Sequence, residues 1–430
     1  MTDVHPPMSD AAFVRTNGIM QAEQVPLPVI AAAVGTPCYV YAANTIRARY
    51  ERLARAFDGV AHQIHFAMKA NSSLAILRLL RSMGAGVDIV SGGELYRAQL
   101  AGYAGTGIVF SGVGKTVPEI QQALDAGVLL INVESEAELV TVNEVASARG
   151  VVAPIAIRVN PEVTVETPHD YIKTGEKGQK FGIPRDDVER IAALALALPH
   201  VALKGLGMHL GSQIANADPM REALPKLLEV VRLVRAQGHA LEFLDVGGGL
   251  AVPYAAGDRA ADVDDYAALI REATRSLGLT LLLEPGRFVV ADAGLLLTQV
   301  LYRKHAAGKD FIVTDAGMND LVRPALYQAF HAIEPVNHVD GEVTADVVGP
   351  ICESGDFFAK DRRMADVQAG DLLAVCTAGA YGYTMASNYN SRPKPAEVLV
   401  DGAQFAIVTE RERFEDLVRL EQSHLQWRST

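Results

Sequence analysis

The stretch "IHFAMKANSSLAILRLLRSMGAGVDIVS", Ile64 to Ser91, contains one complete unit of the pattern that decides the fold. A short apolar run ends at a polar turn, a segment with helical spacing of Leu and Ala follows, and a second apolar run comes next. Near-continuous apolar runs are typical of parallel strands buried on both faces, and the segment between them is long enough for a crossover helix. The stretch therefore predicts a β/α unit with Lys69 at the end of its first strand.

The same pattern recurs along the chain as far as Gly286. The apolar runs are "QIHFAM", "GVDIVS", "GIVFSG", "VLLINV", "PIAIRVN", "LKGLGMHL", "EFLDVG" and "LTLLLEPG". Eight β/α units over roughly 230 residues indicate a closed (β/α)₈ TIM barrel rather than an open doubly wound sheet. We expect this barrel to span residues 45–293.

After about Ala293, strand-like runs follow one another without long helices between them. They are "LLLTQVLY", "DFIVTDAG", "VTADVVG", "DLLAVCTAG", "AEVLVDG" and "AQFAIVTE". This series of strand-like runs predicts a second, antiparallel β domain over residues 294–430. Because "GTPCYVYA" before the barrel also resembles a strand, we expect residues 1–44 to pack with this β domain.

Composition narrows the class of protein. The chain has 430 residues, too many for one ordinary hydrophobic core, so two domains are expected. Its formal net charge is −12, and it contains no run of five or six basic residues. Nucleic acid and anionic membrane surfaces are therefore not expected as partners. No secretory signal or membrane span is evident. Cys38, Cys352 and Cys376 have no CxxC spacing, which argues against disulfides and structural zinc, so we expect a cytoplasmic protein without a metal.

Polar residues gather where the apolar runs end. In such a barrel the site forms at the carboxyl ends of the strands. The residues found there are Lys69, Asp88 with Ser91, Ser111, Glu134, Arg158 with Asn160, His209, Gly247 to Gly249, and Glu284. We expect these groups to converge on one site.

Lys69 and His209 each allow two interpretations. Lys69 is either a solvated residue at a strand end or a lysine that forms a Schiff base. His209 is either a hydrogen-bonded core histidine or a flat ring that stacks on a planar cofactor.

The last two strand ends also leave alternatives open. The three glycines of "DVGGGL" form either a flexible turn or a cradle whose backbone N–H groups face a phosphate. Glu284 forms a salt bridge to Arg287 or Arg158, or holds a proton on a cofactor's ring nitrogen. A Schiff-base lysine, a phosphate cradle, a carboxylate and a stacking ring together indicate pyridoxal 5'-phosphate.

With these residues in view, the sequence resembles the diaminopimelate decarboxylases, in the barrel family shared with ornithine and arginine decarboxylases and with alanine racemase. The similarity runs from about "GTPCYVYA" to "PAEVLVDG". Its matching segments are "FAMKAN", "GVDIVSGGEL", "FSGVGKT", "IRVNP", "KFGIP", "HLGSQI", "DVGGGL", "EPGRFVV", "DAGMNDLVRPALY", "GPICESGD" and "GAYGYTMASNYNSRPKP".

The resemblance implies roles around the cofactor. Lys69 is similar to the lysine that holds pyridoxal phosphate covalently, His209 to the histidine that stacks on its ring, and Glu284 to the carboxylate at the pyridine nitrogen. The phosphate contacts implied by the family are Gly248, the backbone of Glu284, Pro285, Gly286 and Arg287, and Tyr381.

The resemblance also implies roles toward the substrate. Its distal carboxylate would be bound by Arg287, Arg323 and Tyr327, with Ser212 nearby and Tyr381 at the same site. Cys352 resembles a proton donor and Glu353 a contact to the distal amino group. Since a second subunit inserts these two residues in the family, a homodimer with shared active sites is implied.

These residues imply decarboxylation of meso-2,6-diaminopimelate to L-lysine and CO₂, the last step of lysine biosynthesis by this route. Guanidinium groups bind a carboxylate bidentately, whereas a substrate with only an amine at its distal end would be bound by acidic residues. Cys352 suits proton delivery because a thiol's reference pKa is near 8.5. Two alternatives stay open: a decarboxylase of ornithine, arginine or a carboxylated polyamine, and a non-catalytic homologue that binds the cofactor. For Arg323 alone, a surface ion pair is the competing interpretation.

Overall fold

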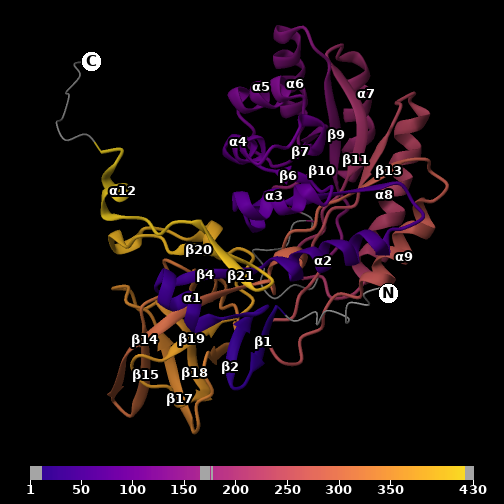
Figure 1. The fold of residues 1–430 in the computed structure, drawn as a ribbon. Helices are drawn as coiled ribbons and strands as arrows, with labels where there is room; N and C mark the ends of the chain where they lie inside the picture. The colour runs from indigo at the N-terminus through magenta and orange to yellow at the C-terminus, as the bar shows by residue number, and fades with distance from the viewer. Residues whose placement is uncertain (1–11, 165–174, 176–177, 422–430) are drawn as a thin grey trace, which may run out of the picture. The chain divides into compact units, whose positions relative to one another are not determined.

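The computed structural model describes residues 12–164, 175 and 178–421, and the chain forms two compact units. One unit is continuous, from Ala43 to Asp292. The other combines the residues up to Ala42 with those from Ala293 onward. In Figure 1 the indigo N-terminal strands and the orange and yellow C-terminal strands accordingly belong to the same unit.

The continuous unit is a closed parallel barrel. In the described part of the chain, eight strands follow one another around it and β9 also pairs with β8, which closes the ring. They are β5 (His62–Ala67), β6 (Gly86–Ile89), β7 (Ile108–Phe110), β8 (Leu130–Val133), β9 (Ala153–Asn160), β11 (Val201–Gly207), β12 (Phe243–Asp245) and β13 (Thr280–Leu283). Each overlaps one of the eight predicted runs, with β5, β9 and β11 starting one or two residues earlier, so the predicted barrel is confirmed. A two-residue strand, β10 (Ile183–Pro184), is added beside β9.

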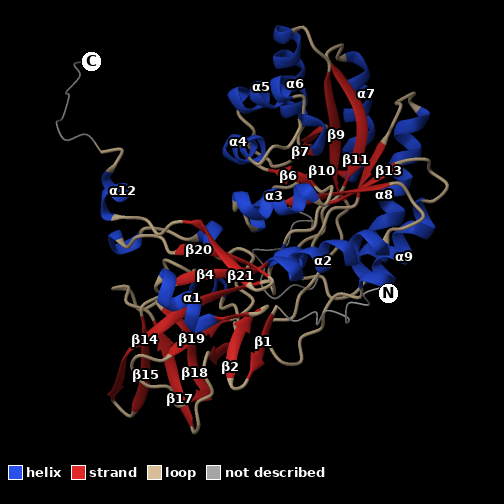
Figure 2. Cartoon of the chain, in the orientation of Figure 1, coloured by secondary structure: helices blue, strands red, loops and turns tan. Residues whose placement is uncertain are grey.

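Helices connect the barrel strands and lie outside them (Figure 2). They are α2 (Ala43–Ala56), α3 (Leu74–Ser82), α4 (Gly92–Leu100), α5 (Val117–Ala126), α6 (Glu136–Arg149), α7 (Arg185–Ala197), α8 (Asp218–Ala236), α9 (Val263–Thr274) and the single turn α10 (Arg287–Val290). In α3 the buried residues are Ile76, Leu77 and Leu80, the spacing of one apolar helix face. The helical spacing in the opening stretch therefore serves to cover the barrel.

Short polar side chains start several of these helices. The Ser91 hydroxyl accepts a hydrogen bond from the Glu94 N–H at 3.2 Å at the start of α4, and Ser135 does the same at the start of α6. Such caps satisfy backbone donors that have no partner within the helix. Ser91, one of the polar residues at the strand ends, is thus a helix cap.

The second unit is a mixed β-sheet centred on β14 (Gly294–Ala306). The strand order is β18-β17-β15-β14-β4-β20-β21. The bounds are β4 (Cys38–Ala42), β15 (Lys309–Thr314), β17 (Glu342–Val348), β18 (Phe357–Ala365), β20 (Ala396–Asp401) and β21 (Gln404–Thr409), with β19 (Leu372–Val375) and β16 (Ile333–Pro335) pairing off this path. Most neighbours are antiparallel, as predicted, but β15 with β17 and β4 with β20 run parallel.

The N-terminal segment is integral to this sheet. β4 lies between β14 and β20, and all five of its residues are buried. Its side chains share a core with Leu27 and Ile30 of α1 (Leu27–Val34) and with apolar residues of β14 and β20. The predicted packing of the N-terminal segment with the C-terminal strands is confirmed.

Several short elements of this unit escaped prediction. They are β1 (Phe13–Thr16), β2 (Ile19–Ala22) and β3 (Val25–Pro26), the helices α11 (Arg323–Tyr327) and α12 (Phe414–Val418), and the helical turns at Tyr383–Met385 and Tyr389–Ser391. Elements of two to five residues are too short to show a repeat of hydrophobicity.

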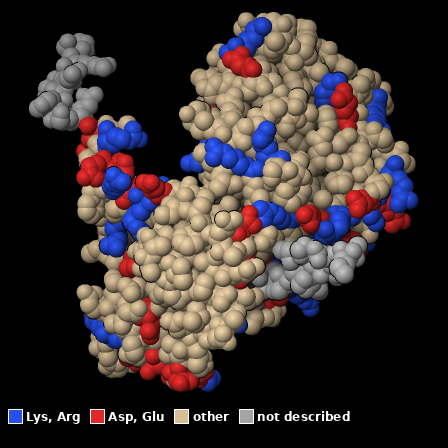
Figure 3. All heavy atoms as spheres, in the orientation of Figure 1, with Lys and Arg blue, Asp and Glu red and all other residues tan. Residues whose placement is uncertain are grey.

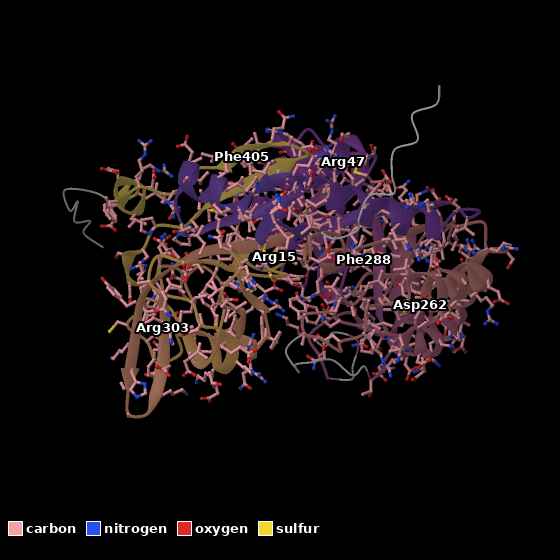
Figure 4. All side chains as sticks on the ribbon, turned by 60° about the horizontal axis from the view of Figure 1, so that its bottom comes forward. Arg15, Arg47, Asp262, Phe288, Arg303 and Phe405 are labelled. Carbon is pink, nitrogen blue, oxygen red and sulfur yellow. The ribbon has the colours of Figure 1, made fainter. Side chains whose placement is uncertain are left out.

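The surface carries charges of both signs. On the face drawn in Figure 3, many Lys and Arg lie in small groups next to Asp or Glu. Two of the residues labelled in Figure 4 show how such side chains are held: Arg303 of β14 pairs with Asp366 at 2.8 Å, and the Asp262 carboxylate accepts backbone N–H groups at the start of α9. No helix among the described residues is long and apolar enough to cross a membrane.

Candidate active site

Lys69 lies at the carboxyl end of β5, in a single helical turn, Met68–Ala70. Its Nζ donates to Asp88 Oδ2 at 3.1 Å, and Asp88 is fully buried at the end of β6. The neighbouring strands β5 and β6 are parallel, so their ends place the ammonium and the carboxylate side by side. Lys69 is therefore directed toward the buried carboxylate at the barrel end, although its side chain is still 37% exposed.

Two further carboxyl groups are buried in this barrel. Asp245 ends β12 and Glu284 follows β13, and the two side chains are hydrogen-bonded to each other. Ser111 Oγ donates to Glu284 Oε1 at 3.5 Å. One small cavity is lined by Asp245, Glu284, Ser111, Asn132, Arg158, Gly207, Met208 and His209.

Burial and nearby negative charge raise the proton affinity of both carboxyl groups. Burial, followed by the charges of Asp245 and Asp88, raises the pKa of Glu284 well above its usual range, while the Lys69 ammonium opposes the shift. Burial raises the pKa of Asp245 to about 6. Glu284 is therefore the more basic of the two carboxyl groups.

His209 accepts a hydrogen bond from the backbone of the glycine run. The Gly248 N–H lies 3.3 Å from His209 Nδ1, and an accepting Nδ1 places the ring proton on Nε2. Desolvation and the charges of Arg158 and Lys69 hold the pKa of His209 well below its usual value. The imidazole is thus a neutral, flat ring at the barrel end.

The glycine run has a conformation that other residues would strain. Gly247 and Gly249 have φ angles of +70° and +95°. A Cβ on Gly248 would lie 2.0 Å from the Glu284 carbonyl oxygen, so the strand ends of β12 and β13 approach too closely for a side chain. The glycine run is therefore a constrained turn whose backbone packs against Glu284.

The segment after Glu284 also packs closely against the turn Met68–Ala70 that carries Lys69. The Ala67 N–H donates to the Pro285 carbonyl at 3.0 Å. A Cβ on Gly286 would lie 3.0 Å from the Ala70 Cβ. Backbone contacts therefore bring Pro285 and Gly286 beside the segment that carries Lys69.

Arg287 is buried and held by two hydroxyl groups. Its Nε and Nη2 donate to Ser212 Oγ at 3.3 and 3.1 Å, and its Nη1 donates to the Tyr254 hydroxyl at 2.6 Å. Its guanidinium also lies 5.7 Å from the Tyr254 ring centroid. Arg158, in contrast, pairs with Glu134 at 3.1 Å. The structure thus brings Ser212 and Arg287 together, as the resemblance implies.

Five of the residues singled out in the sequence lie in the other unit. Arg323, at the start of α11, is buried, and its Nη1 lies 2.9 Å from His331 Nε2. Tyr327 ends the same short helix and is half-buried. Tyr381 is also half-buried and has a φ of +57°, a conformation that a tyrosine rarely adopts.

Cys352 and Glu353 lie in the exposed loop between β17 and β18. The Cys352 N–H donates to Asn390 Oδ1 at 2.8 Å, and the Tyr389 hydroxyl donates to Glu353 Oε2 at 3.2 Å. The buried Asp356 accepts the N–H of Ile351 at 2.6 Å. The loop is therefore held in one conformation while its two functional candidates stay accessible on the unit.

Three polar residues of this arrangement have no role assigned from the sequence. Asp88 was noted only as a strand end, and Asp245 precedes the glycine run, where its place at the end of an apolar run was a usable signal. Tyr254 lies in a loop with no periodic pattern, so nothing in the sequence points to its contact with Arg287.

The residues fit pyridoxal phosphate. Three carboxyl groups, Asp88, Asp245 and Glu284, are buried at this barrel end. The Lys69 ammonium bonds Asp88 and its charge acts on Glu284, while Asp88 Oδ1 is buried without a hydrogen-bond partner among the described residues. This excess of negative charge suits a protonated ring nitrogen. The close backbone at Gly248 suits a phosphate.

The chain matches a known family and known proteins over most of its length. Residues 43–291 match the pyridoxal binding domain of the pyridoxal-dependent decarboxylases. A diaminopimelate decarboxylase of Pseudomonas aeruginosa is 48% identical over 397 residues, which cover 92% of this chain and 95% of that protein.

Solved structures agree with this match. The diaminopimelate decarboxylase of Helicobacter pylori complexed with L-lysine is 41% identical, with a TM-score of 0.89 over 92% of this chain and 99% of that one. That of M. jannaschii in complex with L-lysine is 35% identical, with a TM-score of 0.91 over 97% and 99%. Identity of this extent over nearly whole chains, on a barrel with the expected lysine and carboxylates at its strand ends, leads to one conclusion: the chain belongs to the diaminopimelate decarboxylase family of pyridoxal-dependent decarboxylases.

Proposed function

We propose that this chain decarboxylates meso-2,6-diaminopimelate to L-lysine and CO₂, with pyridoxal 5'-phosphate as its cofactor. The observation that carries the proposal is the contact of Lys69 with Asp88 at 3.1 Å in the same barrel end that holds the buried Asp245–Glu284 pair. When bound, pyridoxal phosphate supplies an electron sink for the charge that loss of CO₂ leaves on Cα.

Each barrel residue has a distinct task. Lys69 holds the cofactor covalently, and His209 offers a neutral ring against its face. Glu284 keeps a proton on the ring nitrogen, a role supported by the burial and the neighbouring carboxylates that raise its pKa. Gly248 and the backbone of Glu284 to Arg287, which includes Pro285 and Gly286, hold the phosphate, together with Tyr381.

The substrate's distal end is assigned to cationic and hydroxyl groups. Arg287 and Arg323 bind its carboxylate, with Ser212, Tyr327 and Tyr381 as hydrogen-bonding neighbours. Buried guanidinium groups bind a carboxylate strongly because little water competes for it. These groups favour a substrate with a second amino-acid end over ornithine, arginine or a plain diamine.

The proton that replaces CO₂ is assigned to Cys352, and Glu353 contacts the distal amino group. Both side chains are exposed on their own unit, which supports a role in the active site of a second copy of the chain and hence a homodimer. The cytoplasmic location stays a prediction; three free cysteines support a reducing compartment.

A substrate panel tests the proposal. Purified protein with added cofactor should absorb in the visible range and release CO₂ from meso-diaminopimelate, with L-lysine as the product. Ornithine, arginine and a carboxylated polyamine should react far more slowly. A preference for a substrate without a distal carboxylate would refute the assignments of Arg287 and Arg323, and binding of the cofactor without any turnover would favour the non-catalytic alternative.

A further inference from the structure

Arg323, assigned above to the distal carboxylate, is held by a histidine that has no assigned role. Its Nη1 lies 2.9 Å from Nε2 of His331. The histidine is fully buried, and Arg323 is only 7% exposed. The two residues are eight positions apart, with the end of α11 and the loop after it between them. A buried contact of this kind fixes a guanidinium far better than solvent does.

The partners of His331 define its protonation. A guanidinium can only donate, so Nε2 must accept from Arg323 and the ring proton must be on Nδ1. His331 Nδ1 lies 2.8 Å from the carbonyl oxygen of Cys376, which can only accept. Both contacts are satisfied by one form of the ring, the neutral tautomer with its proton on Nδ1.

The backbone around His331 is fixed as well. The Cys376 N–H donates to the Ala332 carbonyl at 2.8 Å, which ties the residue after His331 to the end of β19. Arg362 of β18 donates from Nη1 to the His331 carbonyl at 3.0 Å, with its guanidinium 4.0 Å from the Phe330 ring centroid. His331 is therefore positioned by two strands, and through its ring it positions Arg323.

The chemistry of this contact matters for what Arg323 can bind. An acidic residue at position 331 would neutralise the guanidinium and compete with an incoming carboxylate. A neutral imidazole orients the guanidinium without cancelling its charge through this contact. The contact also fixes Nη1 of the planar guanidinium, so the other two nitrogens of Arg323 keep a defined orientation relative to the imidazole ring.

We propose that His331 is a positioning residue for specificity: it holds Arg323 in the orientation that binds the substrate's distal carboxylate. This inference rests on the proposed function, because it assigns the distal carboxylate to Arg323. It predicts that loss of the Nε2 acceptor weakens only those ligands that carry this carboxylate.

Two variants separate the acceptor from the rest of the ring. In His331→Gln the side-chain oxygen stands the same number of bonds from Cβ as Nε2, so it can accept from Arg323. In His331→Asn the amide reaches only the place of Nδ1, so it keeps the contact with the Cys376 carbonyl and loses the acceptor for Arg323. The Asn variant should be impaired and the Gln variant largely rescued.

The readout is competitive inhibition of the cofactor-loaded enzyme by two compounds. L-Lysine carries the distal carboxylate, and cadaverine, its decarboxylated diamine, does not. In His331→Asn the inhibition constant for L-lysine should rise about tenfold while that for cadaverine changes less than about twofold. KM for meso-diaminopimelate should rise similarly, with kcat nearly unchanged. Equal losses for both inhibitors, or equal behaviour of the Asn and Gln variants, would overturn the proposal.

Two further measurements keep the outcomes distinct. Arg323→Ala on the same inhibitors tests the proposed function: if it does not separate L-lysine from cadaverine, the assignment of Arg323 fails. If Arg323→Ala separates them and His331→Asn does not, only the present inference fails. Should His331→Asn not fold, ¹⁵N NMR of histidine-labelled native enzyme decides. The Nε2 resonance of His331, identified by its loss in His331→Gln, should be that of an acceptor nitrogen and should move with L-lysine but not with cadaverine; no such response would refute the proposal.

Discussion

Replacing Asp245 with Asn should stabilise the cofactor-free protein at pH 8 and leave its stability at pH 4 nearly unchanged. Burial raises the pKa of Asp245 from 3.8 to about 6, so at pH 8 the folded state keeps a carboxylate that is more stable in the unfolded chain. The Asn side chain retains an oxygen that can accept the Gly247 N–H, which now bonds Asp245 at 2.8 Å. The substitution therefore removes the buried negative charge and keeps the hydrogen bond from the Gly247 N–H.

The size of the effect follows from the shift. A carboxyl group with a raised pKa lowers stability progressively as pH rises from its unfolded to its folded value, and the full penalty is present above the folded value. A shift of about two units corresponds to about 3 kcal/mol at 1.36 kcal/mol per unit. In a unit of this size, 1 kcal/mol moves Tm by about 2–4 °C, so Tm should rise by roughly 6–12 °C. Because the charge of Asp245 also raises the pKa of Glu284, its removal acts in the same direction there.

Thermal unfolding of the cofactor-free protein between pH 4 and pH 8 measures this. Asp264→Asn is a matched control of opposite sign, since the hydrogen bond from Arg52 lowers the pKa of the exposed Asp264 and its loss should slightly destabilise at pH 8. If Asp245→Asn lowers Tm at pH 8, or raises it equally at pH 4, the argument from buried charge is wrong.

Three other changes test the site. Gly248→Ala should weaken cofactor binding about 5- to 150-fold, because its Cβ would meet the Glu284 carbonyl and overpacking costs about 1–3 kcal/mol; titration with pyridoxal phosphate checks this, and Gly114→Ala, at an open position, should bind normally. Tyr254→Phe removes the hydroxyl contact to Arg287 but keeps the ring, and should raise KM about tenfold with little change in kcat; an unchanged KM would mean that Arg287 needs no such support. Mixing a Lys69→Ala protein with a Cys352→Ala protein should restore part of the activity that each lacks; no restoration would contradict shared active sites.

The barrel could be predicted because its strands are buried on both faces. Such strands are near-continuous apolar runs, and each polar interruption marks a strand end and therefore the site. The convergence of Lys69, Asp88 and Glu284 follows from that rule alone. The rule cannot say which partner each polar group takes: Ser91 lies at a strand end like the others and proves to be a helix cap.

The second unit was less predictable, for a different reason. Its strand-like runs and the role of "GTPCYVYA" were evident from composition, but contacts such as Arg323 with His331 depend on a short helix and a loop. Local hydrophobic periodicity does not predict where such a loop places the residues that follow it. The parallel pairs of β15 with β17 and β4 with β20 likewise depend on long connections rather than on local pattern.

The position of β4 in its sheet has a consequence for synthesis of the chain. About 250 residues separate Ala42 from Gly294, the start of the first strand that pairs with it. At about 5–20 residues per second, translation of that interval takes some tens of seconds. During this time the five residues of β4 have no partner strand, because β14 and β20 have not yet been synthesised. The barrel, whose strands are contiguous, can fold in that time. Nascent chains stalled before residue 294 should therefore bind chaperones through their first forty residues, and those stalled after β20 should not.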